Sequence, residues 1–157
     1  MEKFVWGGMD KSNIYMDENN IRMTMNLRNN FARLADQLML EGKTDLAIKA
    51  LDKCMEVMPE KIIAYNFFMM PVAEAYYKAG QTEKANKLVK RLAEIYKGDL
   101  EYYFSLRPAL SATIDTEKQQ ALSVLSRLMM MTKNYKQDAI SKELEKDFTK
   151  LQGQYGG

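Results

Sequence analysis

The chain of 157 residues contains no histidine and a single cysteine, Cys54. An intramolecular disulfide is therefore impossible, and so are zinc sites built from cysteine and histidine. Every catalytic scheme that needs an imidazole base is excluded as well. We expect no metal and no cofactor, and we do not expect this chain to be an enzyme.

Long apolar runs and an excess of one charge are also missing. The longest apolar stretches, around residues 67–72 and 128–131, are far too short to cross a bilayer. The 23 basic and 21 acidic residues are interspersed along the chain, so no basic stripe is available to neutralise phosphates. No positive region followed by an apolar run marks a signal peptide. We expect neither a membrane span within this chain nor a nucleic-acid partner.

The remaining composition is that of a globular protein, with 46% hydrophobic and 28% charged residues. From Asp17 onward, apolar residues recur at helical spacing between short breaks. Asp17 can cap the first helix, Pro71 lies inside the third helix or near its start as a kink or boundary, and Gly80 ends it. The predicted helices cover about residues 17–40, 44–58, 63–79, 82–97, 100–112, 116–133 and 137–152.

Two of these segments align with each other, residues 34–59 and 72–96. In both, a small residue is followed seven positions later by glycine and five positions after that by alanine; the two sets are Ala35, Gly42, Ala47 and Ala73, Gly80, Ala85. This spacing resembles the tetratricopeptide repeat, in which small residues lie where two antiparallel helices cross and glycine forms the turn. Each such pair leaves an apolar face that a neighbouring pair covers.

The resemblance implies an all-α fold of antiparallel helix pairs in a right-handed superhelix, with about seven helices and an irregular N-terminal segment. The expected organisation is a connector at 1–16, a helical domain at 17–152 and a tail at 153–157. Within the domain we expect repeats at about 28–61 and 66–97, a degenerate repeat at 100–133 and a capping helix at 137–152. Gly42 and Gly80 are 38 residues apart instead of about 34, which places extra residues near 60–65.

Candidate catalytic groups are few. The carboxylate pairs Asp17 with Glu18 and Asp36 with Glu41 are better explained as helix caps and surface charge, and Gly7-Gly8 lacks the rest of a phosphate-binding loop. The thirteen methionines fit core packing better than a pliable binding groove, although both interpretations stay open.

In tetratricopeptide repeats the first helix of each pair lines a concave surface. The resemblance therefore implies a groove for a protein or peptide partner, lined by Asn29, Arg33, Asp36, Phe67, Glu74, Tyr77, Tyr103 and Arg107.

A second resemblance rests on the stretch WGGMDKSNIYMDENNIRM, residues 6–23, joined to the repeats. It is similar to the C-terminal soluble region of large bacterial multipass membrane proteins of unknown function, whose membrane part is similar to protein O-mannosyltransferases. This implies a non-catalytic scaffold domain on the extracytoplasmic, periplasmic side, which binds a protein partner or the parent membrane domain. Residues 1–16 would then form a connector anchored by Trp6. The alternative is a free-standing cytoplasmic adaptor.

Overall fold

The computed structural model describes residues 6, 8 and 14–155 of the chain. These residues form helices and no strands, which confirms the predicted all-α class. The chain divides into two compact units, Met1–Ala85 and Asn86–Gly157. The elements are α1 (Glu18–Leu40), α2 (Thr44–Val57), the 3-10 turn η1 (Phe67–Met69), α3 (Met70–Lys78), α4 (Thr82–Ser105), α5 (Pro108–Ser111), the 3-10 turn η2 (Ala112–Ile114), α6 (Asp115–Asn134) and α7 (Asp138–Tyr155).

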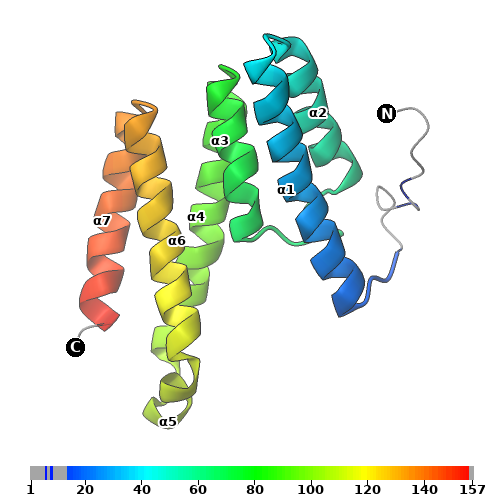
Figure 1. The fold of residues 1–157 in the computed structure, drawn as a ribbon. Helices are drawn as coiled ribbons and strands as arrows, with labels where there is room; N and C mark the ends of the chain where they lie inside the picture. The colour runs from blue at the N-terminus through cyan, green and yellow to red at the C-terminus, as the bar shows by residue number, and fades with distance from the viewer. Residues whose placement is uncertain (1–5, 7, 9–13, 156–157) are drawn as a thin grey trace. The chain divides into compact units, whose positions relative to one another are not determined.

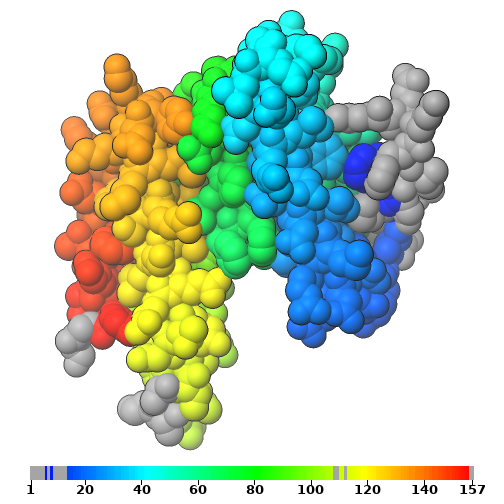
Figure 2. Space-filling view, viewed as in Figure 1, coloured from blue at the N-terminus to red at the C-terminus, as the bar shows by residue number. Residues whose placement is uncertain are grey.

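In the first unit, α1 and α2 form an antiparallel hairpin, and α3 lies directly beside α1 (Figures 1 and 2). Asp17 caps α1, because its carboxylate accepts the backbone N–H of Asn20 at 2.8 Å. The small residues Ala35, Ala47 and Ala73 are completely buried, so the backbones of crossing helices can approach closely. This is the role that the repeat pattern predicted for them.

The same turn follows α1, α3 and α6, the first helices of the pairs α1–α2, α3–α4 and α6–α7. Gly42 and Gly80 have positive φ angles of 74° and 73°, and Lys136, between α6 and α7, has a φ of 57°. In each turn the N–H of the following residue donates to a carbonyl five residues earlier, at 2.8 Å in all three cases. Such a left-handed turn favours glycine, which Lys136 replaces in the third pair.

This repeated turn favours α6 and α7 as the third helix pair. The sequence pattern instead predicted a helix at 100–112 as the partner of the helix at 116–133. In the structure α4 continues without interruption through Gly98 to Ser105, so the predicted break at Lys97-Gly98 is wrong. Glycine weakens a helix interior but does not end it when the following residues continue the helix.

The linker after α2 differs from the prediction of a helix beginning near residue 63. The backbone stays irregular until η1, and Pro71 lies in the first turn of α3, where its missing N–H costs nothing. Arg28, which is completely buried in α1, holds this linker in place. Its guanidinium donates to the carbonyls of Met58 at 3.0 Å, Ile63 at 2.6 Å and Ala64 at 3.0 Å. The residues that lengthen the repeat period are therefore tied to the first helix.

A second polar contact joins α2 to α3 and to the beginning of α4. Asp52 of α2 accepts the hydroxyl proton of Tyr76 at 2.8 Å and the ammonium of Lys84 at 2.6 Å. Burial, followed by this hydrogen bond, raises the pKa of Tyr76 above its ordinary value. In the second unit, Lys97 of α4 pairs with Asp147 of α7 at 2.7 Å, and this hydrogen bond raises the pKa of Lys97.

Candidate functional site

The candidate site in the first unit is the exposed side of α1 and α3, which we call the α1–α3 surface. It consists of Asn29, Arg33 and Asp36 from α1 and of Glu74 and Lys78 from α3. Buried alanines occupy the inward sides of both helices, and Arg33 and Lys78 are exposed on their outer sides. The fold therefore presents these polar groups on rigid helices.

Charges on the α1–α3 surface are partly paired. Lys78 donates to Asp36 at 3.1 Å and lies 3.7 Å from Glu74, so one ammonium bridges two carboxylates from different helices. Asp36 and Glu74 both lie six residues before the glycine that ends their helix, which is why they face the same cation. All three side chains are more than 40% exposed, so the bridge contributes little to folding stability.

Arg33 is the cation on this surface that no described residue neutralises. It is exposed, and it forms no hydrogen bond or ion pair within residues 14–155. Asn29, one turn earlier on α1, is half-buried and likewise has no described hydrogen-bond partner. An unpaired guanidinium next to an amide can bind a carboxylate or a backbone carbonyl of a partner.

The other two predicted groove residues of this unit contribute differently. Tyr77 is only 6% exposed, and burial raises its pKa to about 12, so most of this side chain belongs to the core. Phe67 is half-buried and stacks on Phe68, with 4.4 Å between the ring centroids. The structure therefore offers a polar surface on α1 and α3 bordered by an aromatic pair.

Tyr103 and Arg107, the predicted third-repeat residues, lie elsewhere than expected. Tyr103 is in the last turns of α4 beside Tyr102, and burial, followed by nearby acidic charges, raises its pKa. Arg107 is exposed between α4 and α5. If the helix pairs are aligned on their turns, with Lys136 opposite Gly42, the residue of α6 that corresponds to Arg33 is Arg127. Each of the two arginines lies nine residues before its turn residue. Arg127 is exposed as well.

Several residues of this architecture were missed by sequence reasoning. Lys78 and Arg127 could have been found from the turn register, but Lys136 hides the third turn because lysine rarely has a positive φ. Arg28 gave a weak signal, a charge within the apolar stripe of the first helix. Trp6 was expected to anchor the N-terminal segment, and its ring does stack on Phe31 of α1 at 5.6 Å. Most of the predicted connector 1–16 lies outside the described residues.

Within residues 14–155, no cluster of histidine, cysteine and acidic residues is suited to hold a metal ion. The helices of this part of the chain are also too short or too polar to cross a bilayer. Cys54 is buried, and desolvation raises the pKa of its thiol to about 12, which is unsuited to a nucleophile.

The hairpins and their shared turn define a helical repeat architecture. The family model of the tetratricopeptide repeat matches residues 38–110, from the end of α1 to the beginning of α5. This part of the chain is therefore similar to tetratricopeptide repeats, in keeping with its antiparallel helix pairs. No curated protein and no solved structure matches the chain.

Proposed function

We propose that this chain is a non-catalytic interaction module that binds a peptide segment of a partner protein along the α1–α3 surface. The observation that carries the proposal is the exposed, unpaired Arg33 next to a bridge in which Lys78 already satisfies Asp36 and Glu74. Arg33 is therefore the cation of this surface that has no ion pair among the described residues, whereas the ammonium of Lys78 is shared by two carboxylates. A partner segment with an acidic side chain fits it best.

Peptide display on the isolated chain tests this proposal. We expect selected peptides to carry an acidic residue and to lose at least about tenfold in affinity for Arg33→Glu, because a charge-assisted hydrogen bond becomes a like-charge contact. Lys49→Glu is the matched control, since Lys49 is exposed on α2, away from the α1–α3 surface. Equal losses for the two variants, or peptides without acidic residues, would contradict the proposed site.

We propose further that the module belongs to a longer membrane protein whose membrane part is similar to protein O-mannosyltransferases. The proposal rests on the resemblance of residues 6–23 and the adjoining repeats. On this proposal the partner is an acceptor protein or the membrane part itself, and the module lies on the periplasmic side. Reading the gene upstream of Met1 tests it: an open frame that encodes hydrophobic spans supports it, and a stop codon directly upstream contradicts it.

A further inference from the structure

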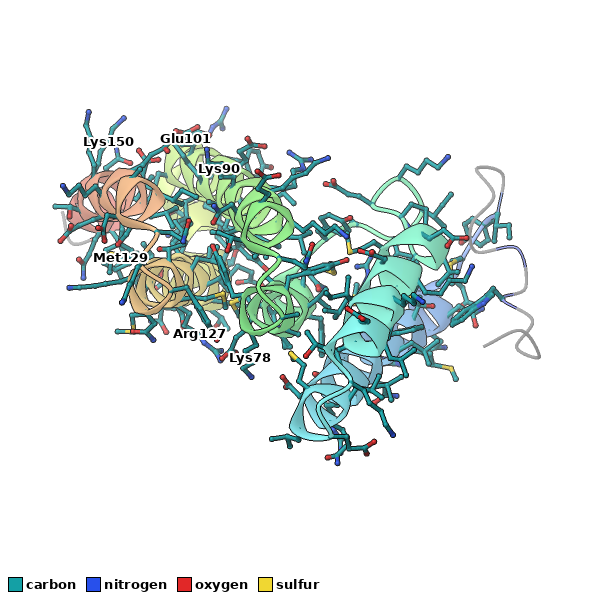
Figure 3. The ribbon with its side chains drawn as sticks, turned by 90° about the horizontal axis from the view of Figure 1, so that it is seen from above. Lys78, Lys90, Glu101, Arg127, Met129 and Lys150 are labelled. Carbon is teal, nitrogen blue, oxygen red and sulfur yellow. The ribbon has the colours of Figure 1, made fainter. Side chains whose placement is uncertain are left out.

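A groove lies along one side of the packed pair of α6 and α7 in the second unit, the third helix pair. We call it the α6–α7 groove; it encloses about 400 Å³ between Met129, Met130 and Lys133 of α6 and Asp138, Lys142 and Glu145 of α7. Met130 is 58% exposed, a large apolar surface for a side chain that folding leaves uncovered. Figure 3 shows Met129 projecting on this side of the helix pair.

The groove results from the size of the residues at the point where α6 and α7 cross. At the positions of Ala35 and Ala47 in the first pair, the third pair has Met129 and Ser141. Ala35 and Ala47 are completely buried, and two such small residues let their helices approach closely. The longer methionine cannot be enclosed in the same way, so Met129 stays half-buried and forms the apolar floor of the groove.

Charges of both signs surround this floor. Lys133, Asp138, Lys142 and Glu145 are all exposed, and none of them forms an ion pair within the part of the chain that the structure describes. Elsewhere in the same unit, Lys97 and Asp147 do pair across α4 and α7 at 2.7 Å. Along α7 the signs alternate from Asp138 to Lys142 to Glu145, which lie on neighbouring turns of one helix face.

Another apolar repeat does not fit this face. In the first two pairs, the residue nine positions after the turn is Leu51 or Val89, and both are completely buried. In the third pair the same position is the exposed Glu145. Covering Glu145 with an apolar helix would remove its carboxylate from water without a partner charge. The occupant of the α6–α7 groove must therefore bring a cation to Glu145.

We propose that a second copy of this chain occupies the α6–α7 groove, forming a two-fold symmetric dimer. If the α7 helices of the two copies run antiparallel, Lys142 of each copy faces Glu145 of the other. The same patch then serves both copies, as a two-fold interface requires. The exposed Met130 and the half-buried Met129 lie next to these ion pairs and become covered. This interface is separate from the α1–α3 surface, so neither proposal depends on the other.

A charge exchange tests the dimer on the full chain by sedimentation equilibrium over a concentration series. We expect reversible dimerisation of the natural sequence. Lys142→Glu should weaken it at least about tenfold, because the two-fold axis creates two like-charge contacts at once. The double variant Lys142→Glu with Glu145→Lys should restore dimerisation, since it exchanges the two signs without changing their complementarity.

The control variant is Lys150→Glu, which reverses an exposed charge of α7 outside the groove lining (Figure 3). We expect it to dimerise like the natural sequence, and helical circular dichroism should be unchanged in all variants. A monomer at every concentration would overturn the proposal. So would an equal effect of Lys150→Glu, or failure of the double variant to restore the dimer.

Discussion

Arg28 shows how a single residue holds an unusual repeat together. Its buried guanidinium satisfies three carbonyls of the linker after α2 and lies 5.1 Å from the centre of the Tyr65 ring. Burial lowers the pKa of Arg28 because the charge is desolvated, although an arginine stays protonated at any ordinary pH. The three carbonyls replace part of the hydration that the guanidinium loses on burial, and its Nε is a buried donor without a hydrogen-bond partner among the described residues.

Replacing this arginine should therefore destabilise the protein strongly. We expect Arg28→Met to lower the free energy of unfolding by on the order of 3 kcal/mol, because it leaves buried carbonyls without donors. Urea unfolding followed by circular dichroism measures the change. Arg33→Met, on the exposed side of the same helix, should change it by less than about 0.5 kcal/mol. A cost for Arg28→Met no larger than that of the control would show that the linker does not need the arginine.

The thiol of Cys54 provides a second test at the scale of the residue. Its folded pKa of about 12 lies above the unfolded value of about 8.5, so the native thiol keeps its proton over a range in which the unfolded thiol loses it. This difference costs stability as the pH rises through 8.5 and beyond. At pH 8 we expect a thiol-disulfide reagent to react slowly with the native protein and rapidly in urea. Rapid reaction without urea would contradict the buried, protonated thiol.

At the scale of the element, periodicity and turn residues predicted much of the fold. Helix starts at Asp17 and near Thr44, and the turns at Gly42 and Gly80, followed from local chemistry that does not depend on distant contacts. The break at Gly98 and the helix near residue 63 were wrong for non-local reasons. Whether Gly98 ends a helix depends on the residues after it, which here continue α4 to Ser105. Whether the segment near residue 63 is helical depends on its contacts with Arg28. The α1 residues of the candidate surface were named from the repeat register and stay a prediction, as do Tyr103 and Arg107, which were named from a third pair at residues 100–133.

Gly98 and Gly80 allow a direct comparison of two glycines. Gly98 lies inside α4 with no atom near the position of an added Cβ, so Gly98→Ala should stabilise the protein by about 0.5–1 kcal/mol. Gly80 has equal space but a φ of 73°, which disfavours any side chain, so Gly80→Ala should destabilise it by about 1 kcal/mol. Thermal unfolding of both variants gives the signs. A gain for both would mean that the turn after α3 tolerates alanine.

At the turn of Lys136 we expect glycine to be more stable than the natural residue. Lysine has a φ of 57° there, whereas the two corresponding turns have glycine. Lys136→Gly should therefore stabilise the α6–α7 pair by up to about 1 kcal/mol, because the strain of the left-handed residue exceeds the added chain entropy of glycine. The midpoint of urea unfolding measures the change. A loss of stability would indicate that the Lys136 side chain forms a favourable contact that outweighs its backbone strain.

For the whole molecule, the division into Met1–Ala85 and Asn86–Gly157 has consequences for cooperativity. In repeat proteins each pair is stabilised mainly by its neighbours, so damage in one unit need not spread evenly. Leu51 of α2 and Leu128 of α6 are both completely buried, one in each unit. Truncating either to alanine should cost about 2–5 kcal/mol of local stability.

Hydrogen exchange followed by mass spectrometry distinguishes the two units. With Leu128→Ala we expect faster exchange in α6 and α7 and nearly unchanged exchange in α1 and α2, because the latter helices keep all their own buried contacts. Leu51→Ala should give the opposite pattern. If each variant instead accelerates exchange equally throughout residues 14–155, the chain unfolds as one cooperative body. The two proposed surfaces could then not be altered independently by core substitutions.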